Sequence, residues 1–322
     1  MIGRVLIAAV SVLICAVSVQ AAGAEWPDRP IRWIVPFGPG GANDLIARVA
    51  AEAVRKGLGQ PIVIENRPGA GAVVGTAAVA KAAPDGYTFL IGAAGVITNS
   101  MLIKNLSYAD SDLVPVGMIA VAPSTIVVNP SVPVSNMKEF VAWAKSQGDK
   151  GVTWATAGSG STPHFVAEMV KEATGISMTI VPFRSGGDSV NAVLANTVSA
   201  TSEASIVVLP QIEGGLLKPI ATTYSKRISA YPSLPTTAEQ GYPTIEIGHW
   251  AGLLAPRGTP QPIIDKMNAE LQAGLKTPEV AEKLSQSGIE PAGGSVADFT
   301  AFIARERKRL GDIAIKAKMG EP

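Results

Sequence analysis

Three glycine-rich segments hold the groups best suited to bind a charged ligand. Residues 36–44 read PFGPGGAND, residues 158–164 read GSGSTPH, and residues 184–188 read RSGGD. Each follows an apolar run that predicts a strand and precedes a helical pattern, so free backbone amides face the loop at the helix start. Glycine lets a ligand approach these amides closely, and the helix dipole favours negative charge there. The segments therefore predict a site for a carboxylate or a phosphate.

Each segment also has a simpler interpretation. The polar residues suit helix capping, and Arg184 suits a solvated surface position. Residues 36–44 lack the lysine and Ser/Thr of a nucleotide-binding P-loop, which disfavours ATP. Residues 69–75, GAGAVVG, have one residue too many for a dinucleotide fingerprint and are interpreted as close backbone packing.

The sequence contains two histidines, His164 and His249. Ser159 and Ser161 lie close to His164 in the sequence, which leaves open an exported hydrolase with one of these serines as nucleophile and His164 as base. However, no G-x-S-x-G motif surrounds either serine, and two histidines without clustered carboxylates make a poor metal site. We expect no catalytic residue, metal or cofactor, and assign the histidines to packing or to one hydrogen bond with a ligand.

Alternating strand and helix patterns must position these segments. The first unit has strand patterns at 31–35, 62–65 and 88–91, with helical patterns at 44–56 and 73–82. This rhythm predicts an α/β fold in which mainly parallel sheets are flanked by helices.

The rhythm breaks over residues 113–128, where prolines punctuate β-branched runs without a helix between them. We interpret this break as the first crossing between two lobes. A second α/β unit follows. The chain then continues with an apolar run at 245–254 and further helical patterns, the last of which covers 296–318. The expected domains are residues 25–124 with 223–322 for lobe 1, and 125–222 for lobe 2. Two such lobes favour a binding protein that closes on its ligand.

The N-terminus predicts export. Residues 1–24 begin with Arg4, continue through an apolar stretch at 5–19 and end in small residues, which is typical of a signal peptide cleaved near Ala24. The alternative is a membrane anchor, but the stretch is short for a span. The single cysteine, Cys15, lies in this segment, so the mature chain has no disulfide.

Composition and charge narrow the class of protein further. The 322 residues are 47% hydrophobic and 16% charged, which is typical of a globular protein large enough for two cores. The net charge of +1 gives no basic surface for a nucleic acid.

Several stretches together resemble the substrate-binding proteins of tripartite tricarboxylate transporters, also called the Bug family. The matching stretches are WPDRP at 26–30, VPFGPGG at 35–41, ENRPGAG at 65–71, APDGYT at 83–88, GSG at 158–160, PFR at 182–184 and LLAPRGTP at 253–260. They run in order along nearly the whole mature chain, and their combination is specific.

The resemblance implies a monomeric periplasmic binding protein with a type II-like two-lobed fold. Such a protein captures a small carboxylate, or a related polar organic molecule, and delivers it to membrane permease subunits; docking on a sensory receptor is the alternative. In the family, backbone amides and ordered water hold the ligand carboxylate. Carried to the matching positions, this implies the ligand-binding residues Gly40, Gly41, Ala42, Asn43, Ala93, Gly95, Ile97, Ser159, Thr162, His164, Ser185 and Gly186.

The chain departs from the family pattern at two places. Ser202-Glu203-Ala204 stands where the family commonly has Phe-Asp-Asn, and Ser185-Gly186 stands where it has a Gly-Gly pair. Near the cleft, Glu203 would repel a second carboxylate or bind a cationic group, and we include it among the site residues. The simpler interpretation of Glu203, which the local sequence favours, is a surface acid that caps a helix.

Overall fold

The computed structural model describes residues 26–148 and 151–320, so the predicted signal peptide lies outside the described residues. The strands are β1 Ile31–Val35, β2 Ile62–Asn66, β3 Thr88–Gly92, β4 Leu113–Val128, β5 Val152–Thr156, β6 Met178–Pro182, β7 Ala200–Ala204, β8 Lys218–Thr222, β9 Gly248–Pro256 and β10 Glu290–Pro291. The helices are α1 Ala42–Leu58, α2 Val73–Ala80, α3 Ala94–Leu102, the 3-10 turn η1 Asp110–Asp112, α4 Met137–Ser146, α5 Thr162–Thr174, α6 Gly186–Leu194, α7 Ser205–Glu213, α8 Gln261–Leu275, α9 Pro278–Gln286 and α10 Val296–Lys316.

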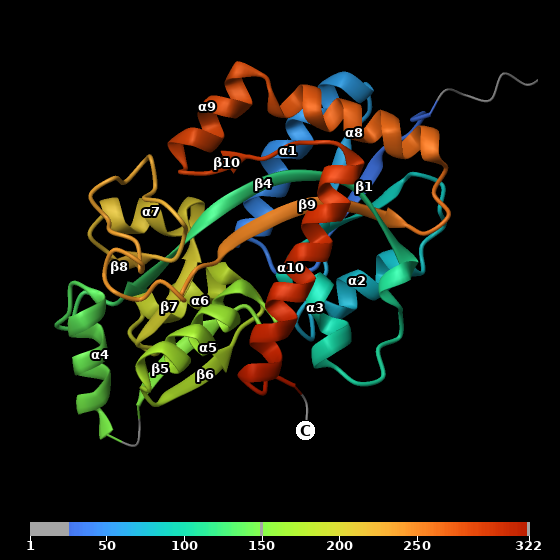
Figure 1. Ribbon diagram of the computed structural model, residues 1–322. Coiled ribbons are helices and arrows are strands. Elements are labelled where there is room, and N and C mark those ends of the chain that lie inside the picture. The colour runs from blue at the N-terminus through green and yellow to red at the C-terminus, as the bar shows by residue number, and fades with distance from the viewer. Residues whose placement is uncertain (1–25, 149–150, 321–322) are drawn as a thin grey trace, which may run out of the picture.

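The strands form one continuous, curled sheet with helices on its faces (Figure 1). The strand order is β2-β1-β3-β9-β4-β7-β5-β6, and β8 and β10 also pair with β4. In the first half β1 pairs in parallel with β2 and β3, while β9 runs antiparallel to β3 and β4. In the second half β5 pairs in parallel with β6 and β7. The predicted α/β class is confirmed. Each half contains three parallel strands, whereas β4 and β9, which lie between these sets, pair antiparallel with their neighbours.

The long strand β4 joins the two halves. Its residues 113–123 pair with β9, whereas residues 124–128 pair with β7. This change of partner lies at the predicted crossing between lobes, and the exact lobe boundaries stay a prediction. Helix α10 spans both halves, because it packs on β4, α3 and α5 (Figure 1).

Sequence patterns missed α3, β7 and α7. Strand β7 reads ATSEA and lacks the β-branched apolar run expected of a central strand, yet all its residues are buried between β4 and β5. Its neighbours in the sheet, and not its own composition, make it a strand. Helix α3 is buried nearly all round, so it shows no clear apolar stripe.

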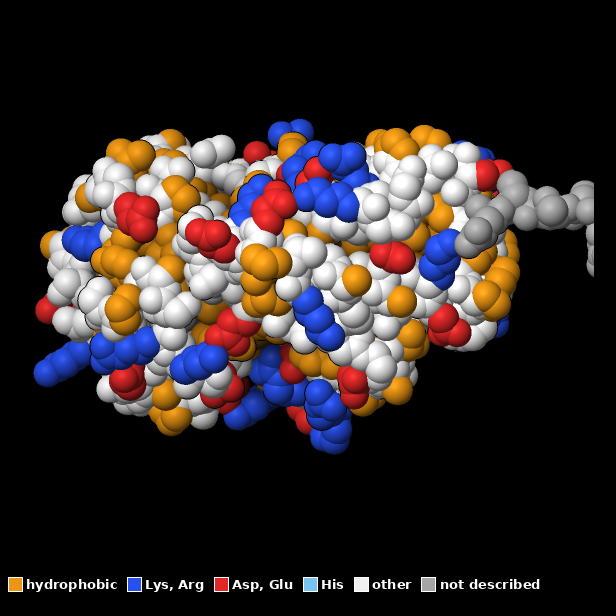
Figure 2. All heavy atoms as spheres, turned by 90° about the horizontal axis from the view of Figure 1, so that it is seen from above, with side chains coloured by type: hydrophobic (Ala, Val, Ile, Leu, Met, Phe, Trp, Pro, Cys, Tyr) orange, Lys and Arg blue, Asp and Glu red, His pale blue; other side chains and the backbone are white. Residues whose placement is uncertain are grey.

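One face of the molecule carries no strong field of one sign. Acidic and basic side chains are interspersed over the face seen from above in Figure 2. Within the part of the chain that the structure describes, no helix is long and apolar enough to cross a membrane.

Candidate ligand-binding site

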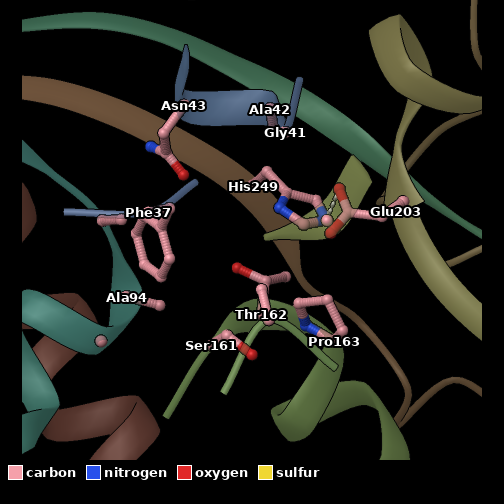
Figure 3. A pocket seen from close by; sticks show the side chains of 14 residues that line it. Phe37, Gly41, Ala42, Asn43, Ala94, Ser161, Thr162, Pro163, Glu203 and His249 are labelled. Carbon is pink, nitrogen blue, oxygen red and sulfur yellow. Dashed lines mark ion pairs between the residues drawn. The ribbon is translucent and has the colours of Figure 1, made fainter. Parts of the chain in front are cut away.

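A small pocket with a cavity volume of about 20 Å³ lies between the two halves of the molecule (Figure 3). The lining residues come from the loops after β1, β3, β5 and β6 and from the strands β7 and β9. They are Phe37, Gly41, Ala42, Asn43, Ala93, Ala94, Gly95, Ala157, Ser161, Thr162, Pro163, Gly186, Glu203 and His249. No lysine or arginine is among these lining residues.

Four helices begin at this pocket. Gly41 precedes α1, Ala93 precedes α3, Ser161 precedes α5 and Ser185 precedes α6, and each of these helices follows a strand that ends at the same region. The first-turn amides of a helix have no partner within the helix, and its N-terminus carries a partial positive charge. The pocket therefore offers amide donors and favourable electrostatics to an anion without any cationic side chain.

The two halves meet through glycines beside the pocket. The Gly38 amide donates to the Arg184 carbonyl over 2.9 Å. A Cβ built on Gly41 would lie 3.1 Å from the backbone nitrogen of Gly186, and one built on Gly71 would collide with the Ser159 carbonyl. Since a side chain at Gly41 or Gly71 would separate these loops, the glycines allow the closed arrangement.

Asn43 and Asp44 hold the first loop. The Asn43 Nδ2 donates to the Trp250 carbonyl over 3.1 Å, and the amide oxygen of Asn43 points toward the pocket (Figure 3). Asp44 is buried and accepts hydrogen bonds from the Gly40 amide, Arg48 and Asn66. Burial acts to raise the pKa of Asp44, but these hydrogen bonds outweigh it and hold that pKa below its ordinary value.

Glu203 and His249 face each other across one wall of the pocket (Figure 3). Glu203 is 2% exposed, its Oε2 accepts a 3.0 Å hydrogen bond from the Ala204 amide, and burial raises the pKa of its carboxyl to about 7. The His249 Nε2 lies 3.8 Å from that Oε2, beyond hydrogen-bond distance, and has no hydrogen-bond partner among the described residues. Burial lowers the pKa of His249 to about 3, so its imidazole is neutral at ordinary pH.

The simpler interpretation of Glu203 as a surface acid is wrong. Glu203 lies on the central strand β7, opposite Thr125 of β4, and its carboxyl is directed into the pocket instead of toward solvent. The interpretation failed because the local sequence contains no signal that β7 is a buried strand.

Most of the predicted site residues gather in this pocket, while the rest lie outside it. The predicted residues that line it are Gly41, Ala42, Asn43, Ala93, Gly95, Thr162, Gly186 and Glu203. Those outside it are Gly40, Ile97, Ser159, His164 and Ser185.

Local hydrogen bonding explains three of the five residues outside the pocket. The Gly40 amide donates to Asp44. Ile97 is buried within α3, and its carbonyl accepts a hydrogen bond from Arg307. The Ser185 hydroxyl caps α6 by accepting from the Asp188 amide. These groups serve the loops and helices around the pocket.

Ser159 and His164 instead line a larger and more open cavity, which shares Phe37 and Ala157 with the small pocket. The His164 Nδ1 accepts from the Gly160 amide over 3.1 Å, and the Ser161 hydroxyl donates to the Gly158 carbonyl over 2.7 Å. The side chains of His164 and Ser161 thus brace the start of α5. Among the described residues, no hydrogen bond joins a serine hydroxyl to a histidine ring. Nor do these residues contain a cluster of histidine and acidic side chains that would hold a metal ion.

Sequence reasoning missed some of the lining residues. Phe37, Ala94, Ala157, Ser161 and Pro163 adjoin predicted residues, so a wider window around each loop would have included them. His249, for which packing or one hydrogen bond with a ligand was expected, lines the pocket, and it reaches it through the pairing of β9 with β4.

The sequence and the fold of this chain are both similar to those of known proteins. Residues 46–319 match the model of the tripartite tricarboxylate transporter family receptor. The chain is 34% identical to BugT of Bordetella pertussis over 96% of both chains. Its structure is similar to that of the periplasmic binding protein BugD, with a TM-score of 0.88, 35% identity and coverage of 92% of this chain and 100% of the other.

A third relative was solved with a ligand. MatC from Rhodopseudomonas palustris with bound malate has a TM-score of 0.85 and 30% identity, with coverage of 89% of this chain and 99% of the other. These similarities confirm the two-lobed fold of periplasmic binding proteins. The chain belongs to the tripartite tricarboxylate transporter receptor family, the Bug group of periplasmic solute-binding proteins.

Proposed function

We propose that this protein binds a small organic carboxylate in the pocket between its two halves and delivers it to the permease subunits of a membrane transporter. The observation that carries the proposal is the convergence of four helix N-termini on one pocket whose lining contains no lysine or arginine. Backbone amides at helix starts favour a carboxylate whatever the rest of the molecule is. Malate, which carries two carboxylates, is bound to the relative MatC.

Ligand binding is coupled to closure. The starts of α1 and α3 belong to one half of the molecule, and those of α5 and α6 belong to the other. A carboxylate between them contacts both halves only when the halves are together, so it shifts the population toward the closed form. The contacts of Gly38 with Arg184 and of Gly41 with Gly186 then help to hold that form.

Delivery follows from closure. The closed form presents surfaces of both halves in one fixed relation, which a permease or, in the alternative, a sensory receptor recognises. Cross-linking of the mature monomer to each candidate membrane partner, with and without ligand, distinguishes transport from sensing. The proposed location is the periplasm after cleavage near Ala24, and the mass of the exported chain tests that cleavage.

A thermal-shift screen of the mature protein tests the proposed binding. The panel contains mono-, di- and tricarboxylates, amino acids and neutral amides of matched size. A ligand at one hundred times its Kd stabilises the folded state by about 2.7 kcal/mol, which is a measurable rise in Tm. We expect hits among molecules with a carboxylate and none among the amides. Well-folded, ligand-free protein that responds to no carboxylate would contradict the proposed function.

A further inference from the structure

The carboxyl of Glu203 already occupies one of the helix starts at the pocket. A Cβ built on Gly186, the first residue of α6, would lie 2.7 Å from Glu203 Oε2 and closer still to the rest of that carboxyl. Glycine at position 186 thus leaves the space that the carboxyl fills. The Ala204 amide, at the start of α7, donates to the same oxygen. The protein's own acid therefore sits at the N-termini of two helices, where an anionic ligand group would otherwise bind.

At the remaining helix starts no acidic side chain lines the pocket, because Asp44 in the first turn of α1 is bonded to Gly40, Arg48 and Asn66 and does not line it. The lining at the starts of α1, α3 and α5 consists of small or uncharged residues, with Asn43, Ser161 and Thr162 as the polar side chains. A ligand carboxylate finds its amide donors at these three helices. The pocket thus has one anion-binding end that is free and one end that carries a negative group of its own.

His249 completes the second end. It lies opposite Ala122 on one side of β4, while Glu203 lies opposite Thr125 on the other side of that strand. The His249 Nε2 is buried, has no hydrogen-bond partner among the described residues and stands 3.8 Å from Glu203 Oε2. The two side chains leave hydrogen-bonding capacity for a group that the ligand brings to this wall.

We propose that Glu203, with His249, determines specificity by binding an ammonium group, so that the preferred ligand carries one carboxylate and one ammonium group. This inference rests on the proposed function and narrows its ligand class. With such a ligand the charges in the pocket balance, because the ammonium pairs with Glu203 and the carboxylate meets the helix starts. A dicarboxylate would place a third carboxyl in a pocket whose lining has no cationic side chain, which disfavours its binding.

Matched pairs of probes test the inference by titration calorimetry on the mature protein at neutral pH. Each pair replaces one carboxylate by an aminomethyl group: succinate with 4-aminobutanoate, malate with 4-amino-2-hydroxybutanoate, and adipate with 6-aminohexanoate. We expect the amino acid of at least one pair to bind ten times more tightly than its dicarboxylate, and no pair to show the reverse. Glu203→Gln keeps the shape of the side chain but removes its charge, and should reduce this preference at least tenfold. Glu213→Gln removes an equal charge from the exposed end of α7 and should leave the preference unchanged.

Three results overturn the inference, and they differ from one another. A preference for the dicarboxylate in any pair shows that Glu203 does not select an ammonium group. An unchanged ratio in Glu203→Gln shows that the selection lies elsewhere in the pocket. If no probe binds and the wider carboxylate screen is also flat, the proposed function itself fails and this inference fails with it. If Glu203→Gln does not fold, the unmodified protein still shows whether the amino acid or the dicarboxylate of each pair binds more tightly, and this decides the first result.

Discussion

Replacement of Glu203 by glutamine should stabilise the ligand-free protein above neutral pH. The Glu203 carboxyl is 2% exposed, and the one hydrogen bond that it accepts, from the Ala204 amide, does not offset the loss of water around its charge. Burial raises the pKa of Glu203 from 4.5 to about 7. Glutamine has nearly the same shape and no charge to bury, so the folded state of the variant avoids this cost.

The expected size of the effect follows from the shift in pKa. Between pH 4.5 and about 7 the folded protein binds more protons at Glu203 than the unfolded chain does, so this group lowers the free energy of unfolding as pH rises. At about 1.4 kcal/mol per pH unit, the total loss is about 3 kcal/mol. The stability difference between Glu203→Gln and the unmodified protein should therefore grow from near zero below about pH 4.5 to about 3 kcal/mol above about pH 7, where both states are ionised.

His249 is the one other titratable side chain among the lining residues. Burial lowers its pKa from 6.5 to about 3, so it increases stability as pH rises through that range, opposite in sign to Glu203. Because His249 is present in both proteins, its contribution largely cancels in the difference. The difference between the two proteins therefore isolates Glu203.

Urea denaturation of both proteins across this pH range measures the difference, with m-values compared to verify that the extent of unfolding is the same. Glu213→Gln, which removes an equal charge from the exposed end of α7, serves as the matched control. A stability difference that stays constant from acid to alkaline pH would refute the reasoning. It would mean that folding does not raise the pKa of Glu203, and so that its carboxyl is either exposed to water or paired with a positive charge.

Three further variants test the pocket and its supports. Gly41→Val places a branched side chain against the Gly186 amide, so the Tm rise on adding ligand should vanish while the far-UV circular dichroism stays unchanged; a full rise would contradict the closed contact. Asn43→Ala leaves the buried Trp250 carbonyl without its hydrogen bond, and urea denaturation should show a loss of about 1–3 kcal/mol together with weaker ligand binding. Phe299→Ala opens a cavity under α10, where Phe299 is 1% exposed and packs against Trp250, and should cost about 3–5 kcal/mol; a loss below 1 kcal/mol would contradict that packing.

Local chemistry made the loops around the pocket predictable. The strand at Ile31–Val35 has the predicted bounds, because the apolar pattern of a strand is a short-range signal. Glycines at helix starts, Gly41 before α1 and Gly186 as the first residue of α6, likewise mark free amides directly in the sequence. The same signals could not show whether a loop residue faces the pocket or its own helix. Gly40 and Ser185, which the family resemblance placed in the site, hydrogen-bond within their own loop and helix.

The sequence by itself determined the α/β class, the order of the loops and the kind of ligand group that helix starts attract. Only the tertiary structure decided that Glu203 and His249 share one wall of the pocket. These residues belong to strands on either side of β4, and their proximity depends on the register of both pairings. Register is set by contacts between residues far apart in the chain, so no short stretch of sequence carries it. Burial of the polar strand β7 has the same origin, and it places an acid that looks like a surface residue in the lining of the pocket.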